Sequence, residues 1–364
     1  MNRIIEEDLI HTYQGLTNKE KEKLKNSKVL LIGAGGFLGQ YYLRFFNYYF
    51  KELSLRKIVA LDNFILGESP LIKQNRNNEN VVIKTFDIAK DDLSLIDDLV
   101  KDVDYVFHLA SIASPIIYRK NPIETFDSNV SGLRNVLEYY KNKSVKGILY
   151  YSSSEAYGNP DVEHIPTKED YHGYVNTIGP RSCYDESKRA SETLAYLFNQ
   201  QYRLPVRIVR LFNIYGPGLK LNDYRVISDF ARNIKKKEDI EILSNGLPTR
   251  SFCYISDSAI GEIKSLLYDK FDVFNIGIDE KEVSINDLAD TMLFIAKRDF
   301  GYEGKIVYGV SKDANYLKDN PDRRFPNLDK TKKVLNYCPT IMLEDGIKRY
   351  LTYVLESDIN DLIW

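Results

Sequence analysis

The 364-residue sequence has few of the residues that build metal centres and disulfide-stapled folds. Its three cysteines, Cys183, Cys253 and Cys338, lie far apart without Cys-x-x-Cys spacing, and none of its four histidines has a ligand-type neighbour at metal-site spacing. Both features argue against a zinc site and a disulfide framework, and they fit a reducing compartment. We therefore expect no bound metal and a cytoplasmic location.

The sequence also lacks an excess of charge of one sign and long apolar runs. The chain has 50 Lys and Arg against 52 Asp and Glu, a formal net charge of -2, so no overall positive field attracts nucleic acid. No stretch approaches the roughly 18 apolar residues of a membrane-spanning helix, and the first residues lack the basic start and apolar run of a signal peptide. A hydrophobic fraction of 43% in a chain of this length predicts a large core, divided between two substructures.

A glycine-rich turn between an apolar strand and an apolar helix is the first candidate site. The strand covers residues 29–32, and the turn carries Gly33, Gly36 and Gly39 in the spacing Gly-x-x-Gly-x-x-Gly. In a dinucleotide-binding turn the first glycine permits the tight turn, the second lets the backbone approach a pyrophosphate, and the third lets the helix pack on the strand. The helix N-terminus then faces the phosphates.

Acidic residues at the ends of the next two predicted strands select the dinucleotide. The strand at 58–61 ends in Asp62, about where a carboxylate accepts hydrogen bonds from the adenosine ribose hydroxyls and would repel a 2′-phosphate. The strand at 81–86 is followed by Asp87 and Ile88, which we expect at the adenine edge. The sequence thus predicts NAD, rather than NADP, as the cofactor.

Predicted strands and helices alternate from residue 28 to residue 212. Further strands are expected at 104–110, 147–151 and 206–212, with helices at 129–140 and 184–202 between them. Such alternation predicts an α/β fold with a Rossmann-type doubly wound parallel sheet. We expect an N-terminal helical arm at 1–27, an NAD-binding domain at 28–212, and a smaller α/β substrate-binding region at 213–364, part of which crosses back to the sheet.

Tyr184 and Lys188 lie four residues apart, so on the predicted helix their side chains share one face. A free tyrosine has a pKa of about 10, so a phenolate base at neutral pH needs a shift of about 3 units, or roughly 4 kcal/mol. The lysine ammonium and an oxidised nicotinamide ring are cations that favour the phenolate. The serine cluster at 152–154 supplies the hydroxyl that holds a substrate alcohol while it becomes a ketone.

This ordered set of motifs resembles the extended short-chain dehydrogenase/reductase family, which modifies nucleotide sugars, over residues 28 to 353. Within the family the chain is most similar to the UDP-glucuronate decarboxylase (UDP-xylose synthase) branch. The run Val-Asn-Thr-Ile-Gly-Pro-Arg-Ser-Cys-Tyr-Asp-Glu at 175–186 is specific to that branch. More widely shared are Leu-Asp-Asn-Phe at 61–64, His-Leu-Ala-Ser-Ile-Ala-Ser-Pro at 108–115, Leu-Phe-Asn-Ile-Tyr-Gly-Pro at 211–217 and Thr-Arg-Ser-Phe-Cys-Tyr at 249–254.

The resemblance implies that UDP-glucuronate is oxidised at C4, loses carbon dioxide as a β-keto acid, is protonated at C5 and regains its hydride, so that NAD is regenerated and UDP-xylose leaves. It assigns Tyr184 as the base, Lys188 as the group that tunes it, and Ser153 as the partner of the C4 oxygen. Glu155 would orient the ring or relay a proton, or merely pair with a cation. Arg324 would meet the substrate carboxylate or the diphosphate.

The resemblance also implies two sets of binding residues. Besides the three glycines, the cofactor would contact Phe37, Leu38, Asp62, Asn63, Asp87, Ile88, Leu109, Ala110, Tyr184 and Lys188. The nucleotide sugar would contact Pro115, Tyr118, Asn213, Arg225, Arg250 and Arg324. Arginine suits this task because its planar guanidinium matches phosphate oxygens.

A homodimer is implied as well, in which the helices at 129–140 and 184–202 pair with their symmetry mates in a four-helix bundle. Apolar Ala190, Leu194 and Leu197 on the second helix are consistent with this arrangement.

Four departures and three alternatives accompany the resemblance. His172, Ser153 and Ser187 stand where the family usually has tryptophan, threonine and glycine, and the arm at 1–27 is additional. The first alternative is a nucleotide-sugar 4,6-dehydratase, many of which have Asp-Glu where this chain has Ser154 and Glu155. The second, a 4-epimerase, leaves Glu155 without a task. The third, a catalytically silent NAD-binding scaffold, is disfavoured because the serine, tyrosine and lysine are all present.

Overall fold

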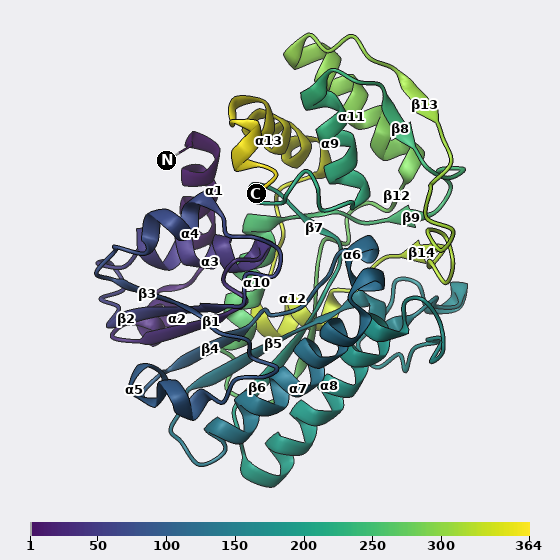
Figure 1. The fold of residues 1–364 in the computed structure, drawn as a ribbon. Coiled ribbons are helices and arrows are strands. Elements are labelled where there is room, and N and C mark those ends of the chain that lie inside the picture. The colour runs from purple at the N-terminus through teal and green to yellow at the C-terminus, as the bar shows by residue number, and fades with distance from the viewer. Residues whose placement is uncertain (1) are drawn as a thin grey trace.

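The computed structural model describes residues 2–364 and is built around a seven-stranded parallel sheet (Figure 1). From edge to edge its strands are β11 (Val273–Ile276), β6 (Val206–Leu211), β5 (Gly147–Ser153), β4 (Tyr105–His108), β1 (Lys28–Ile32), β2 (Lys57–Asp62) and β3 (Val81–Thr85). The strand order reverses between β1 and β4, where a doubly wound sheet opens a crevice at its carboxyl ends. The predicted α/β fold with a Rossmann-type sheet is confirmed.

Helices cover both faces of this sheet because apolar side chains alternate along its strands. In β1, Leu30 and Ile32 pack on one side while Val29 and Leu31 pack on the other. The first side is covered by α7 (Pro122–Tyr140), α8 (Ser182–Tyr202), α5 (Asp97–Val100) and the 3-10 helix η1 (Leu93–Ile96). The second is covered by α1 (Arg3–Gln14), α2 (Asn18–Leu24), α3 (Phe37–Tyr48), α4 (Pro70–Asn75), α10 (Ile255–Leu266) and α12 (Asp329–Leu335).

The rest of the second half forms small sheets and helices near the carboxyl ends of the central strands (Figure 1). The sheets pair β7 (Ile214–Tyr215) with β10 (Cys253–Tyr254), β9 (Thr249–Arg250) with β12 (Val283–Ser284) and β14 (Arg323–Arg324), and β8 (Ile240–Ile242) with β13 (Ile306–Tyr308). Packed around them are α9 (Val226–Lys236), α11 (Ile285–Phe300) and α13 (Leu343–Glu356). The short helices are α6 (Pro115–Lys120), η2 (Ser154–Tyr157), η3 (Val162–His164) and η4 (Ile359–Asp361).

The N-terminal arm packs into the core against elements from the far end of the chain. Leu9 of α1 is fully buried in the cluster that contains α3, α10 and α13. The neighbouring Asp8 is also fully buried, where it accepts a 2.8 Å hydrogen bond from the Tyr254 hydroxyl and a 3.0 Å bond from the Arg349 guanidinium. Burial raises the pKa of Asp8 to about 6 even though Arg349 opposes the shift.

Within residues 2–364, no helix combines the length and apolar character needed to cross a membrane.

Candidate active site

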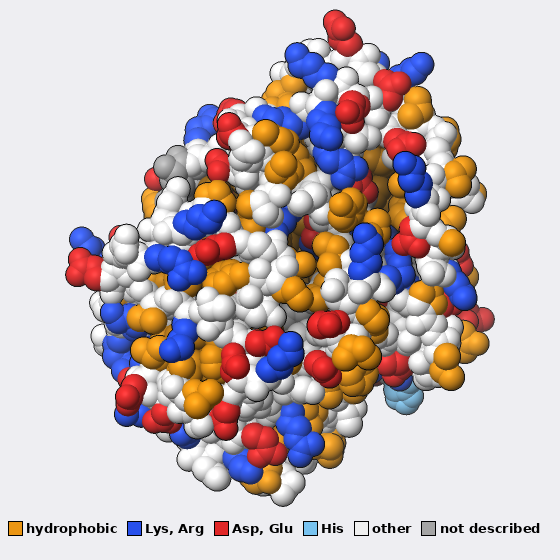
Figure 2. Space-filling view, in the orientation of Figure 1, with side chains coloured by type: hydrophobic (Ala, Val, Ile, Leu, Met, Phe, Trp, Pro, Cys, Tyr) orange, Lys and Arg blue, Asp and Glu red, His pale blue; other side chains and the backbone are white. Residues whose placement is uncertain are grey.

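Two adjoining cavities, of about 380 and 310 Å³, open where the carboxyl ends of the central strands face the second half of the chain. The surface is hollowed there, near the centre of Figure 2. Gly33, Gly36, Phe37 and Leu109 line both cavities, so the two form one continuous cleft over the glycine turn. This is the crevice in which a doubly wound sheet binds its ligand.

At two positions of the glycine turn, any side chain would clash with the backbone. Gly33 has a φ of +89°, and a Cβ there would lie 2.6 Å from the backbone nitrogen of Ala110. A Cβ on Gly39 would lie 2.2 Å from the carbonyl oxygen of Gly33, so any side chain would push α3 off the turn. Gly36 caps α3, whose N-terminus opens onto the cleft and can meet an anion.

The smaller cavity contains the residues expected around the adenosine. Its walls include Asp62, Asn63, Asp87, Ile88, Leu109 and Ala110. Asp62 ends β2, and its two carboxylate oxygens accept hydrogen bonds from the backbone N–H groups of Gly35, at 2.8 Å, and Phe64, at 2.7 Å. Each oxygen keeps a lone pair for a ribose hydroxyl, so this pocket fits the adenosine half of NAD.

The larger cavity holds Tyr184 and Lys188, which α8 presents toward the end of β5. The Lys188 ammonium donates a 2.7 Å hydrogen bond to the carbonyl oxygen of Tyr151 and lies 5.4 Å from the centroid of the Tyr184 ring. Burial lowers the pKa of Lys188 to about 7. Burial also raises the pKa of Tyr184 to about 12, against the opposing effect of its hydrogen bond with Ser153. Oxidised NAD, when bound, would add a positive charge that favours the phenolate.

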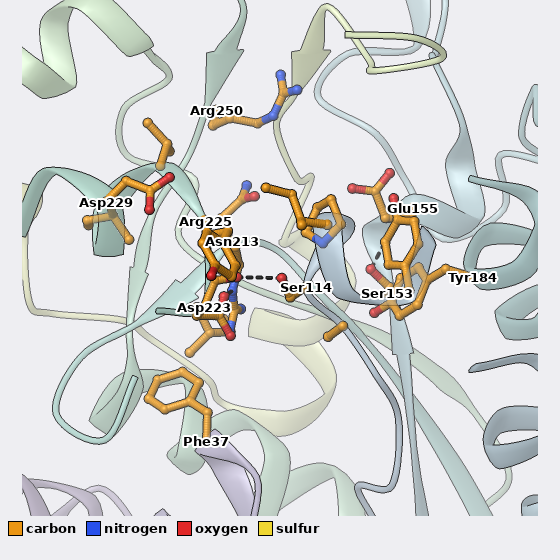
Figure 3. Close-up of a pocket in the computed structure, with 18 of the residues that line it drawn as sticks. Phe37, Ser114, Ser153, Glu155, Tyr184, Asn213, Asp223, Arg225, Asp229 and Arg250 are labelled. Carbon is orange, nitrogen blue, oxygen red and sulfur yellow. Dashed lines mark hydrogen bonds and ion pairs between the residues drawn. The ribbon is translucent and has the colours of Figure 1, made fainter. Parts of the chain in front are cut away.

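Ser153 at the end of β5 and Glu155 just after it face the same part of the cavity as Tyr184 (Figure 3). Ser153 is the last residue of the strand, and its Oγ accepts a 3.2 Å hydrogen bond from the backbone N–H of Glu155. The tight 3-10 turn thus brings both side chains to one rim of the cleft.

Two guanidiniums hold the Glu155 carboxylate. Its Oε2 lies 2.6 Å from Nη2 of Arg181 and 2.8 Å from Nη2 of Arg324. Burial alone would raise the pKa of Glu155, but the charges of Arg181 and Arg324 outweigh burial and lower it to about 2. Glu155 is therefore ionised at neutral pH.

Arg324 is the expected site residue that does not line the cleft. Its side chain is 1% exposed, and Nη2 also donates a 3.0 Å hydrogen bond to the carbonyl oxygen of Gly158. The atoms Nε and Nη1 are fully enclosed. The guanidinium lies behind Glu155, and its expected contact with a substrate carboxylate or diphosphate stays a prediction.

Sequence reasoning missed two members of this cluster, Arg181 and Asp185. Arg181 lines the larger cavity, and its Nε donates to the buried Asp185 carboxylate at 3.4 Å. Burial and the nearby charge of Glu155 raise the pKa of Asp185 to about 7. The sequence held a clue to Arg181. It lies three residues before Tyr184 and seven before Lys188, spacings that bring side chains to the same side of a helix.

The larger cavity is also lined by the residues expected to bind the nucleotide sugar: Pro115, Tyr118, Asn213, Arg225 and Arg250.

Most of these side chains are fixed by neighbours. Asn213 donates a 2.9 Å hydrogen bond to the carbonyl oxygen of Ser251, and Arg250 donates a 2.6 Å bond to that of Pro321. Arg225 makes a two-pronged ion pair with Asp223, whose backbone oxygen accepts a hydrogen bond from Ser114 (Figure 3). Guanidiniums held in this way are preorganised for a diphosphate.

A loop between β13 and β14 completes the wall with Tyr316, Leu317 and Asn320, for which the sequence pattern carried no signal. In the described part of the chain, no group of three His, Cys, Asp or Glu side chains is arranged to hold a metal ion.

The fold and this cleft define an NAD-binding enzyme class with a serine, tyrosine and lysine at the strand ends. The profile of the NAD dependent epimerase/dehydratase family matches residues 29–277, and the chain belongs to that family.

Curated relatives match most of the chain. UDP-glucuronic acid decarboxylase 6 of Arabidopsis thaliana is 34% identical over 88% of this chain and 87% of its own length. UDP-glucuronic acid decarboxylase 1 of Xenopus tropicalis is 32% identical over 90% of this chain and 72% of its own length.

Solved structures share the fold. The UDP-glucose 4-epimerase of Thermotoga maritima has a TM-score of 0.75 at 23% identity, covering 90% of this chain and 98% of its own. The UDP-glucuronic acid 4-epimerase of Bacillus cereus, in complex with UDP-glucuronic acid and NAD, has a TM-score of 0.74 at 24% identity with the same coverage.

Proposed function

We propose that the protein converts UDP-glucuronate to UDP-xylose and carbon dioxide, using NAD as a catalyst that is regenerated in each cycle. The observation that carries the proposal is the ion pair of Glu155 and Arg181 on the cavity wall beside Ser153 and Tyr184. A sugar whose C4 oxygen lies at Tyr184 has its C6 carboxylate only two carbon–carbon bonds away, at this charged wall. The decarboxylase names of the curated relatives support the same reaction.

Tyr184 and Ser153 handle the proton of the C4 hydroxyl. NAD, when bound, accepts a hydride from C4 and later returns it. Tyr184 takes the hydroxyl proton while Ser153 keeps the oxygen in place by a hydrogen bond. After carbon dioxide leaves, the same two hydroxyl groups donate to the C4 oxygen, where the electrons of the broken bond collect as an enolate. Tyr184 then returns its proton when C4 is reduced.

Glu155 has two expected tasks, and its ionised state supports one of them. A carboxylate with a pKa of about 2 carries no proton at neutral pH, so Glu155 accepts hydrogen bonds and orients the sugar ring. A proton delivered to C5 has to come from another donor, such as water relayed past this carboxylate.

The same ionised carboxylate favours one second candidate, a nucleotide-sugar 4,6-dehydratase. That reaction needs a base for the C5 proton, and an ionised Glu155 at the cavity wall can serve as one. The preceding residue is Ser154, which lacks the carboxyl group that would protonate the leaving water. We therefore rank dehydration second.

We further propose a homodimer formed by the outer faces of α7 and α8. These helices pack side by side on one face of the sheet (Figure 1). On their outer faces α7 exposes Ile123 and Phe126, and α8 exposes Leu197, which is 52% accessible. Exposed apolar side chains on two adjacent helices are suited to burial against a second copy.

The test of the proposed reaction is to incubate purified protein with UDP-glucuronate and, separately, with neutral nucleotide hexoses. Decarboxylation predicts carbon dioxide and a product of UDP-pentose mass. Loss of water from a hexose, without carbon dioxide from UDP-glucuronate, would replace it with dehydration.

A further inference from the structure

One oxygen of Glu155 is shared by two guanidiniums that differ in access to the cleft. Arg181 and Arg324 each place Nη2 within 2.8 Å of Oε2. Arg181 belongs to the wall of the larger cavity. Arg324 is 1% exposed, and its other two nitrogens are enclosed by protein atoms. A ligand in the cleft can therefore touch Arg181 directly, whereas it can reach Arg324 only through Glu155.

Arg181 also lies at the correct position relative to the reacting carbon. It immediately precedes α8, three residues before Tyr184, so the two side chains are neighbours on one helix face. Its guanidinium lies 6.0 Å from the ring centroid of Tyr118, which stacks on Tyr184 with centroids 5.3 Å apart. Arg181, Tyr118 and Tyr184 thus form one continuous surface from the C4 side of the sugar toward C6.

The guanidinium of Arg181 retains donors for a ligand. Nη2 faces Glu155 and Nε faces Asp185, while among residues 2–364 no partner is found for Nη1. The N–H groups of Nη1 can be donated to a carboxylate in the cavity.

The pKa of Arg250 reports the charges around Arg181. Arg181 and Arg324 lie near the carboxylates of Glu155 and Asp185, while Arg250 interacts with Glu155 and with Asp322. Burial and the charges of Arg324 and Arg181 lower the pKa of Arg250 to about 10, against the opposing effects of Glu155 and Asp322. An anionic group bound beside Arg181 would offset this repulsion.

We propose that Arg181 is the residue that binds the C6 carboxylate of the substrate and so selects a hexuronate, while Arg324 is a positioning residue that acts through Glu155. This inference rests on the proposed function, since it requires a sugar with a carboxylate at C6.

Glu155 and Asp185, the carboxylates paired with Arg181, help it to bind a substrate carboxylate that is lost as carbon dioxide. During decarboxylation negative charge moves from the carboxylate to the C4 oxygen, so a free cation at C6 would stabilise the ground state more than the transition state. Glu155 and Asp185 already balance much of the charge of Arg181. The guanidinium can then orient the carboxylate by hydrogen bonds with less ground-state stabilisation.

The test compares two ligands that differ only in the carboxylate. UDP-glucuronate and UDP-xylose are titrated calorimetrically into holoprotein carrying Tyr184→Phe, which slows turnover, with and without Arg181→Gln. Loss of a charge-assisted contact should raise the Kd of UDP-glucuronate by about 10- to 100-fold. The Kd of UDP-xylose should stay within about 2-fold, because it makes no contact at C6. Arg324→Gln should change the Kd of both ligands by the same factor. Arg298 is an exposed arginine of α11, so Arg298→Gln should change the Kd of neither ligand.

Equal weakening of both ligands by Arg181→Gln, or no weakening of either, would overturn the inference. The double variant Arg181→Gln with Asp185→Asn preserves the net charge of the cluster and should show the same selective loss if the single variant folds poorly. Failure of the proposed function gives a different result, in which the wild type releases no carbon dioxide from UDP-glucuronate whatever the Arg181 variants bind.

Discussion

Lys188 donates its hydrogen bond to the carbonyl oxygen of Tyr151, at 2.7 Å, so its ammonium is tied to the end of β5. Burial at this place lowers the pKa of Lys188 to about 7. Its charge therefore changes near neutral pH in the protein without cofactor, and folding stability should report that change.

We predict that Lys188 makes stability increase with pH above neutrality. An unfolded lysine keeps its proton up to its ordinary pKa of 10.5, whereas the folded one loses it near 7. Between these values the unfolded state binds more protons, so the free energy of unfolding rises by up to about 1.4 kcal/mol per pH unit. Urea unfolding of NAD-free wild type and Lys188→Met from pH 7 to 9.5 checks this. The difference between them should grow with pH, and parallel curves would contradict it.

Tyr184→Phe should reduce turnover by about 10² to 10⁴-fold, the usual contribution of a positioned acid–base group. The fold and the NAD content should stay unchanged, because the phenyl ring can still stack on Tyr118. Tyr196→Phe is the matched control, since Tyr196 lies exposed on the same helix and should tolerate the change. Near-normal turnover in a folded, NAD-loaded Tyr184→Phe protein would place the base elsewhere.

The N-terminal arm should contribute to global stability. Leu9→Ala removes a fully buried side chain from the main core, so the free energy of unfolding should fall by about 2 to 5 kcal/mol. Arg3→Ala, at an exposed position of the same helix, should change it by less than about 0.5 kcal/mol. Chemical denaturation measures both. A loss at Leu9 no larger than that at Arg3 would mean that the arm unfolds independently.

The proposed dimer depends on the outer faces of α7 and α8. Leu197→Asp puts a charge at an exposed apolar position of α8 and should convert the dimer to monomer at micromolar concentration. Light scattering coupled to size exclusion gives the mass directly. A monomeric wild type, or an unchanged dimer in the variant, would exclude this interface.

The sheet was predictable because its strands repeat a short apolar run followed by turn and helix signals. The expected strands at 58–61 and 206–212 correspond to β2 and β6 within a residue at each end. Nothing local marked β11 as the seventh strand, since its place beside β6 depends on a return of the chain from far downstream. Such non-local pairings are visible only in three dimensions.

The site was predictable where function imposes spacing, as for the glycines and the pair Tyr184 and Lys188. Two electrostatic features were not. Spacing alone did not reveal that burial gives Tyr184 a pKa of about 12, or that Arg324 lies behind Glu155. Both depend on which side chains exclude water, and helical spacing was the only available clue to Arg181.

The most direct measurement of the proposed chemistry is labelled carbon dioxide from UDP-glucuronate that carries the label at C6. We predict that purified protein releases the label in step with UDP-xylose, without accumulating NADH, and that Tyr184→Phe nearly abolishes the release. The contrary result is no labelled carbon dioxide under conditions where the same protein removes water from a neutral nucleotide hexose.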